Sequence, residues 1–84
     1  MASYDVFLHF KLLDGVPDSR SQRRRIIEFL RRLSEQPDTP GDYADKDASS
    51  RERQIKIVGE YAVTYWVDDP ARAVMVVDIC PAGR

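Results

Sequence analysis

The chain has 84 residues, a hydrophobic share of 43% and a formal charge of −1, as is usual for a soluble globular protein. A domain of this size buries only about 60–65% of the surface that its unfolded chain exposes, so its core is small. We therefore expect a single domain over residues 1–84 that acts through a surface or a partner, not through a deep cleft. No apolar run approaches the roughly 20 residues of a membrane span, and no signal peptide is expected.

A single cysteine and a single histidine limit the chemistry of the chain. Cys80 and His9 are the only residues of their kinds. This excludes an intrachain disulfide, a cysteine-based zinc site and a His-pair metal site, so we expect no metal and no cofactor. A reducing, cytoplasmic setting fits best. A structural role is the main interpretation of His9, and a catalytic role is the minority one.

Charge is unevenly distributed along the chain. Residues 1–37 hold seven basic and five acidic side chains, a net +2, whereas residues 38–84 hold six basic and nine acidic ones, a net −3. A nucleic-acid-binding protein is usually more basic than this, which argues against a simple nuclease. A local basic patch could still contact phosphate.

Two periodic segments open the chain. Residues 4–10 alternate in polarity, which predicts a strand with one apolar face. A helix is predicted from Ser19 to Glu35, because Ser19 and Gln22 form a capping-box pattern and Pro37 blocks its continuation. Four side chains form its apolar face: Ile26, Phe29, Leu30 and Leu33. Its arginine-rich side is interpreted as a solvated face with i,i+4 ion pairs, and a phosphate-contacting edge is the alternative.

A polar segment and a final strand are predicted in the second half of the chain. The residues from Asp38 to Glu52 predict a loop, which at this length is more often functional or mobile than inert. Residues 74–80 are apolar almost throughout, which predicts a central strand covered on both faces. The first strand is expected to pair beside this last one.

The stretch from Ile55 to Val67 predicts a β-hairpin, because β-branched and aromatic residues lie on both sides of Gly59. We expect this hairpin on the other side of the last strand. The order of elements is then strand, helix and three strands. It predicts an α+β domain in which one helix covers one face of a small, mostly antiparallel sheet.

The register of the hairpin decides which of its side chains face solvent. A two-residue turn at Gly59 and Glu60 would place Lys56 among aromatic side chains. We predict instead an odd-length loop or a bulge with Ile57 opposite Tyr61, because that register gathers apolar side chains on the helix-covered face. The covered face would hold Ile55, Ile57, Tyr61, Val63 and Tyr65. The open face would present Gln54, Lys56, Val58, Ala62, Thr64 and Trp66.

Several segments between Ile26 and Ile79 occur together in one protein family. They are Leu30-Arg31-Arg32-Leu33, Pro37, Gly41-Asp42-Tyr43, Gln54 to Gly59, Tyr61 to Asp68 and Val76 to Ile79. This ordered set resembles the RelE/ParE superfamily of type II toxin–antitoxin toxins, the plasmid stabilisation proteins. The resemblance implies a cytoplasmic toxin held inactive by a cognate antitoxin. It also implies that the target is either messenger RNA on the ribosome or DNA gyrase.

The same resemblance implies site residues on the open face. RNA-cleaving members use basic side chains there to activate a 2′-hydroxyl and to stabilise the phosphorane. By this likeness Lys56 and Arg53 are the candidate catalytic residues, and Arg51, Arg53 and Lys56 are the candidate RNA-binding residues. Trp66 and Val58 are the candidate antitoxin contacts.

Departures from the family pattern keep two functions open. Ala62 stands where ribosome-dependent members place an arginine, and no His or Tyr follows Tyr65. Residues 11–16 are also too short for the full first helix of the family. One hypothesis is a ribosome-dependent mRNA endoribonuclease with a reduced catalytic set. The other is a non-enzymatic binding protein of the same fold, either a gyrase poison or a lapsed toxin that binds an antitoxin. A homo-oligomeric structural domain is a weaker third idea.

Overall fold

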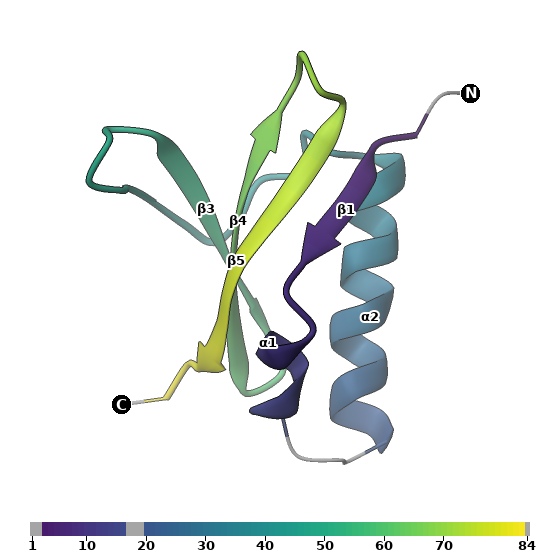
Figure 1. Ribbon diagram of the computed structural model, residues 1–84. Coiled ribbons are helices and arrows are strands. Elements are labelled where there is room, and N and C mark those ends of the chain that lie inside the picture. Colours follow the sequence, from purple (N-terminus) through teal and green to yellow (C-terminus); the bar gives the residue numbers. More distant parts are fainter. Residues whose placement is uncertain (1–2, 17–19, 84) are drawn as a thin grey trace.

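The structure is a computed structural model that describes residues 3–16 and 20–83. A five-stranded sheet carries one long helix on one of its faces (Figure 1). The elements are, in chain order, β1 (Asp5–Leu8), α1 (Lys11–Asp14), α2 (Arg20–Glu35), β2 (Tyr43–Lys46), β3 (Glu52–Val58), β4 (Tyr61–Asp68) and β5 (Ala73–Pro81). The predicted α+β class is confirmed. Neither described helix is long and apolar enough to cross a membrane.

The order of strands in the sheet is β1-β5-β4-β3-β2. β1 pairs parallel with β5, and all the other neighbours are antiparallel. The predicted position of β5, between the first strand and the hairpin, is therefore confirmed. The prediction that β5 is covered on both faces is wrong, because Val77 is 41% exposed and Asp78 is exposed as well.

The core lies between α2 and the sheet. The four predicted apolar side chains of α2 are all buried, and Ile26 and Leu33 are completely so. They belong to one cluster with Val63, Tyr65 and Val74 of the sheet. Burying an aliphatic side chain of this kind stabilises the fold by about 1.5–3 kcal/mol. The proposed cap residue Ser19 lies outside the described residues.

The first strand is shorter than predicted, and a single helical turn follows it. β1 ends at Leu8, and α1 begins at Lys11. Phe10 is exposed, so it is not part of an apolar strand face. α1 has four residues, which agrees with the expectation that this part of the chain is too short for a full helix.

The polar segment from Asp38 to Glu52 is not a continuous loop, and that prediction is corrected. β2 lies inside it and pairs antiparallel with β3, Tyr43 opposite Ile55. All four β2 side chains are exposed, so the strand shows none of the polar–apolar alternation by which a half-buried strand is recognised. A charged, short edge strand of this kind also discourages pairing with foreign chains.

The predicted register of the hairpin is wrong. Val58 pairs with Tyr61, so the turn has only two residues. The first of them, Gly59, has a φ of 62°, a left-handed conformation that a II′ turn needs at this position. The irregularity expected in the hairpin lies instead between β4 and β5, at Thr64 and Tyr65.

This difference of one residue exchanges the two faces of β3. Lys56 and Val58 face the side of α2, and Val58 is only 9% exposed, whereas Ile55 and Ile57 face the other side. Lys56 and Gln54 are tolerated on the covered face because the chain between α2 and β2 pairs with them. The N–H of Gly41 donates to Gln54 Oε1 at 2.9 Å, and Lys56 Nζ lies 3.5 Å from an Asp42 oxygen.

Candidate binding surface

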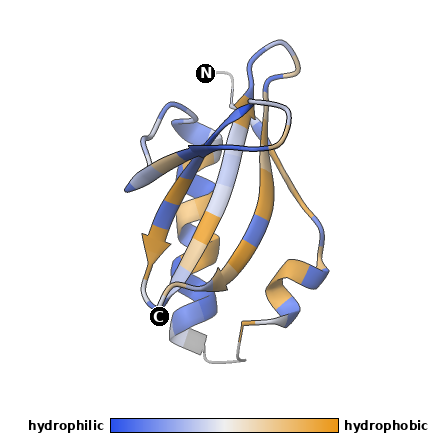
Figure 2. Cartoon of the chain, turned by 90° about the vertical axis from the view of Figure 1, so that its left-hand side faces the viewer, coloured by the Kyte–Doolittle hydropathy of each residue, from blue (hydrophilic) through white to orange (hydrophobic). Residues whose placement is uncertain are grey.

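The sheet face opposite α2, which we call the open face, carries most of the candidate side chains. Figure 2 looks onto this face, with α2 behind the strands. Register partners across it are Phe7 and Met75, Met75 and Trp66, and Tyr43 and Ile55. Phe7 on β1 and Tyr43 on β2 are more than half exposed, so apolar surface is accessible near both edges of the sheet.

Arg51 covers part of the predicted antitoxin contact Trp66. The guanidinium carbon of Arg51 lies 4.1 Å from the centroid of the indole ring, a cation–π arrangement. Arg51 Nη1 also lies 3.4 Å from Asp47 Oδ2. Asp47 accepts hydrogen bonds from the backbone N–H groups of Arg51 and Ser49, and these bonds, with the nearby guanidinium charges, lower its pKa. Trp66 is therefore a half-buried ring under a paired arginine.

Arg53 makes a bidentate ion pair with Asp45. Its Nε and Nη2 donate to the two carboxylate oxygens of Asp45 at 2.9 and 2.8 Å. These hydrogen bonds raise the pKa of Arg53, and the charges of Asp45, Asp47 and Asp78 add to the effect. This geometry is the one in which a guanidinium binds a carboxylate or a phosphate best. A phosphate group would have to compete with Asp45 for the same donors.

Lys56 lies on the opposite side of the sheet from Arg51 and Arg53. It is paired with Asp42, whose other oxygen accepts the N–H of Ile57 at 2.8 Å. That hydrogen bond first, and then the charge of Lys56, lowers the pKa of Asp42. The structure therefore does not bring together the three cations that were predicted to contact one RNA.

One short segment, residues 42–47, supplies the partners of all three cations. Its carboxylates are those of Asp42, Asp45 and Asp47. We call this segment the aspartate segment. Because three carboxylates face three cations, the charges of this region balance. No sequence signal marked this segment as a strand, because all four β2 side chains are exposed and Asp42 and Asp47 lie outside β2.

The remaining predicted residues have structural surroundings. Val58 belongs to the buried core, so it is not a surface contact. Tyr65 is completely buried, and its hydroxyl donates to the backbone oxygen of Thr39 at 2.9 Å. Burial, with a contribution from the charge of Asp42, raises the pKa of Tyr65 to about 12. The Nδ1 atom of His9 accepts the N–H of Lys11 at 3.2 Å, at the start of α1.

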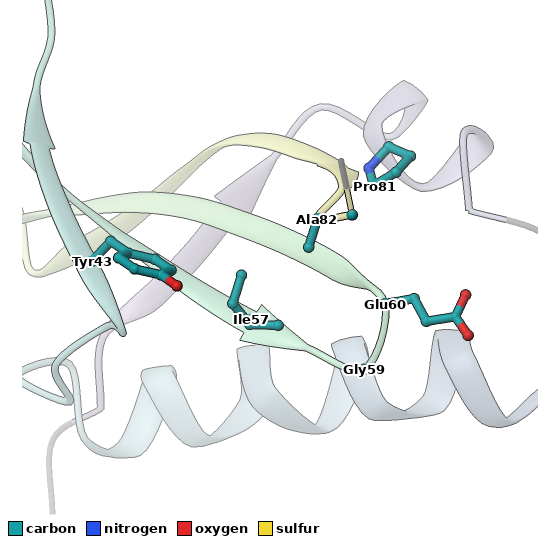
Figure 3. Close-up of a pocket in the computed structure, with 7 residues that line it drawn as sticks. Tyr43, Ile57, Gly59, Glu60, Pro81 and Ala82 are labelled. Atoms are coloured by element: carbon teal, nitrogen blue, oxygen red, sulfur yellow. The ribbon is translucent and has the colours of Figure 1, made fainter.

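A hollow of about 640 Å³ lies near one end of the open face (Figure 3). Figure 3 shows Ile57 at its centre, with Tyr43 on one side and Glu60, Pro81 and Ala82 on the other. The N–H of Ala82 donates to the backbone oxygen of Glu60 at 2.9 Å and so holds the C-terminal segment beside the turn. The lining is mixed: apolar side chains lie beside backbone groups, one phenol and one carboxylate. In the described part of the chain, no three potential metal ligands converge.

Comparison with known proteins identifies the fold. No protein-family model matches the chain, and no curated protein matches it significantly. Among solved structures it is similar to a chain of the archaeal RelE–RelB complex from Pyrococcus horikoshii OT3, with a TM-score of 0.75. The two chains are 24% identical, and the match covers 96% of this chain and 97% of the other. The fold is therefore RelE-like, as the sequence resemblance implied.

Proposed function

We propose that the chain is the toxin component of a type II toxin–antitoxin system and that it acts by binding other macromolecules. The observation that carries this proposal is the similarity of 96% of the chain to a chain of a RelE–RelB complex. The partner that this likeness supports is an antitoxin protein, in the cytoplasm. The partly exposed Trp66 and the hollow at Ile57 offer it contacts.

Binding is favoured over RNA cleavage by the pairing of the candidate cations. Cleavage through a phosphorane needs cations aimed at the scissile phosphate and a group that takes the proton of the attacking hydroxyl. Arg51 and Arg53 are each held by an aspartate, and Lys56 lies on the other face. A non-enzymatic toxin, for example one that poisons DNA gyrase, needs no such catalytic set.

A second function, ribosome-dependent cleavage of messenger RNA, has one observation in its favour. Arg51 stacks on Trp66, and Arg53 lies on the same face. An aromatic ring beside guanidinium groups is a combination that binds single-stranded nucleic acid by stacking and charge. In this alternative Arg51 and Arg53 bind the RNA backbone after release from Asp47 and Asp45.

The test is to express the chain alone and together with the product of the neighbouring reading frame. We expect growth to stop in the first case and to resume in the second, with the two proteins purifying as one complex. Normal growth with the chain alone, and no complex, would overturn the proposal. Inhibition of gyrase supercoiling by purified chain, with messenger RNA intact, separates the binding function from cleavage.

A further inference from the structure

Trp66 lies in the middle of a row of side chains that crosses the open face. The strand register places Phe7 beside Met75 and Met75 beside Trp66. Extending the antiparallel register of β3 and β4 by one residue carries Arg53 next to Trp66 on its other side. The row therefore joins aromatic and apolar surface to a guanidinium group.

The side chain of Arg51 covers the indole ring within this row. Its guanidinium carbon lies 4.1 Å from the ring centroid of Trp66. A stacked aromatic group would need the same place, so this face of the ring is occupied as long as Arg51 lies there. The side chain of Arg51 is 47% exposed, so its outer side borders solvent.

Asp47 holds Arg51 in this position through a single, long ion pair. Arg51 Nη1 lies 3.4 Å from Asp47 Oδ2. Arg53, by contrast, donates two hydrogen bonds of 2.9 and 2.8 Å to the two carboxylate oxygens of Asp45. A bidentate pair is the stronger arrangement. Of these two arginines on the open face, Arg51 is therefore the one that leaves its carboxylate more readily.

The carboxylate of Asp47 is positioned by the backbone of the tip between β2 and β3. Its Oδ1 accepts the N–H groups of Ser49 at 2.8 Å and of Arg51 at 2.9 Å. The N–H of Asp47 donates in turn to the backbone oxygen of Arg51 at 3.0 Å, and Ser50 between them has a φ of 65°. These bonds do not use the guanidinium group, so the tip keeps its shape when the side chain of Arg51 swings away.

We propose that Arg51 is a latched lid over Trp66 and that a single-stranded nucleic acid opens it. In the open position a base stacks on the indole ring, and the guanidinium group exchanges the Asp47 carboxylate for a backbone phosphate. Base stacking on an aromatic ring and backbone binding by cations are the contacts by which such strands are bound without sequence preference. A nucleotide carries the planar group and the anion in one unit, which favours it over a peptide segment.

The lid goes beyond the proposed function, because it controls access to the open face whether or not the chain is a toxin. It requires that the open face binds nucleic acid, and it requires neither cleavage nor growth arrest. The lid and the proposed function therefore fail in separate experiments.

Trp66 is the only tryptophan of the chain, so its fluorescence reports the lid directly. We expect D47N and R51A to raise the Stern–Volmer constant for quenching by acrylamide and to shift the emission to longer wavelength, because both uncover the ring. Asn at position 47 keeps an oxygen for the two backbone N–H groups, so D47N removes the charge and preserves the tip. D42N is the matched control. It removes a carboxylate of the same segment whose partner, Lys56, lies on the covered face, and it should leave the fluorescence unchanged.

The affinity for a short oligouridylate RNA at low salt tests what opens the lid. D47N should bind about two- to fivefold more tightly than the wild type, which is the range expected for the loss of one exposed ion pair. R51A should bind more weakly, although its ring is equally uncovered, because the phosphate loses its cation. D42N should bind as the wild type does. Fluorescence anisotropy of the labelled RNA measures all four affinities.

Three results would overturn the inference. Quenching that is unchanged in both D47N and R51A would show that Arg51 does not cover the ring. Equal gains of RNA affinity in D47N and D42N would reduce the effect to net charge. A ring uncovered in D47N without any gain of affinity would show that nucleic acid does not open the lid.

Discussion

The two edges of the sheet differ in how their charges and backbone groups are satisfied. At the β2 edge, the aspartate segment pairs with three cations of the chain itself. At the β1 edge, an apolar groove and the arginines of α2 lie beside backbone groups that have no partner within the described chain. The comparison teaches that basic residues of one small domain are not equivalent. Those on and next to β3 are paired with aspartates of the fold, whereas Arg24 and Arg31 of α2 have no carboxylate within 4.0 Å among the described residues.

The largest expected effect concerns the anchoring of α2 beside the β1 edge. Leu33 is completely buried, and the next residue, Ser34, closes that edge through Tyr4. L33A should lower the free energy of unfolding by about 2–5 kcal/mol, because it leaves a cavity in the core. I27A, on the same helix but 44% exposed, should cost much less. Denaturant titration measures both, and equal losses would contradict the assigned core.

The attachment of the β2 edge depends on a close approach of Gly41 to β3. A Cβ at Gly41 would lie 2.7 Å from the backbone oxygen of Ile55, so the two backbones would have to separate. G41A should therefore destabilise the fold by about 1–3 kcal/mol, as overpacking does. G15A is the matched control, since nothing lies within 4 Å of its new Cβ. A G41A variant as stable as G15A would contradict this packing.

The connection that leads to β2 is held by the buried hydroxyl of Tyr65. Y65F should lose about 0.5–1.5 kcal/mol at neutral pH, because the backbone oxygen of Thr39 loses its donor. Burial raises the pKa of Tyr65 from 10.0 to about 12, so the stability it contributes is complete below pH 10 and lost as the pH rises toward 12. The loss amounts to about 3 kcal/mol at most.

This alkaline loss is measured by unfolding the chain at several pH values between 9 and 12. Y65F should lack the corresponding part of the decline. Y43F should retain it, because Tyr43 is 63% exposed. A wild-type decline that Y65F leaves unchanged would show that another group titrates.

The smallest effect on stability is expected at the aspartate segment. Replacing Asp42, Asp45 and Asp47 by Asn removes three exposed ion pairs, and such pairs contribute little. The lowered pKa values of Asp42 and Asp47 mean that their contribution is present above about pH 3.8 and is lost as the pH falls below it. The triple variant should lack this acid-dependent part in an unfolding series from pH 5 to 2.

The same triple variant sharpens the contrast between the two edges. It should bind a single-stranded RNA oligonucleotide several-fold more tightly at low salt, because Arg51 and Arg53 are released on the open face. Adding salt should abolish the gain. Filter binding measures the affinity, and an unchanged affinity would show that the aspartates do not mask these arginines.

The helix and the existence of the hairpin could be predicted because their signals are local. The 3.6-residue period of Ile26, Phe29 and Leu33 marks the buried side of α2 wherever the helix packs. The hairpin was likewise evident from the β-branched and aromatic residues around Gly59. These features do not depend on contacts between distant parts of the chain.

The hairpin register and β2 could not be predicted in this way. The register depends on Gln54 and Lys56 finding partners in the chain between α2 and β2, which the sequence pattern of the hairpin does not contain. Counting the apolar side chains of the hairpin favoured the register that places Lys56 and Val58 on the open face, and that register is wrong. For the candidate site, Arg51, Arg53 and Trp66 lie on the open face as expected, whereas Lys56 and Val58 do not.

The most direct test of the central claim compares two proteins expressed without a partner. They are the wild-type chain and the R51A/R53A variant. The variant lacks two arginines that are paired with aspartates in the wild-type fold. If the chain is a toxin that acts by binding, both should arrest growth and leave messenger RNA intact. Messenger cleavage and growth arrest that both disappear in the variant, or normal growth with the wild-type chain, would contradict the account.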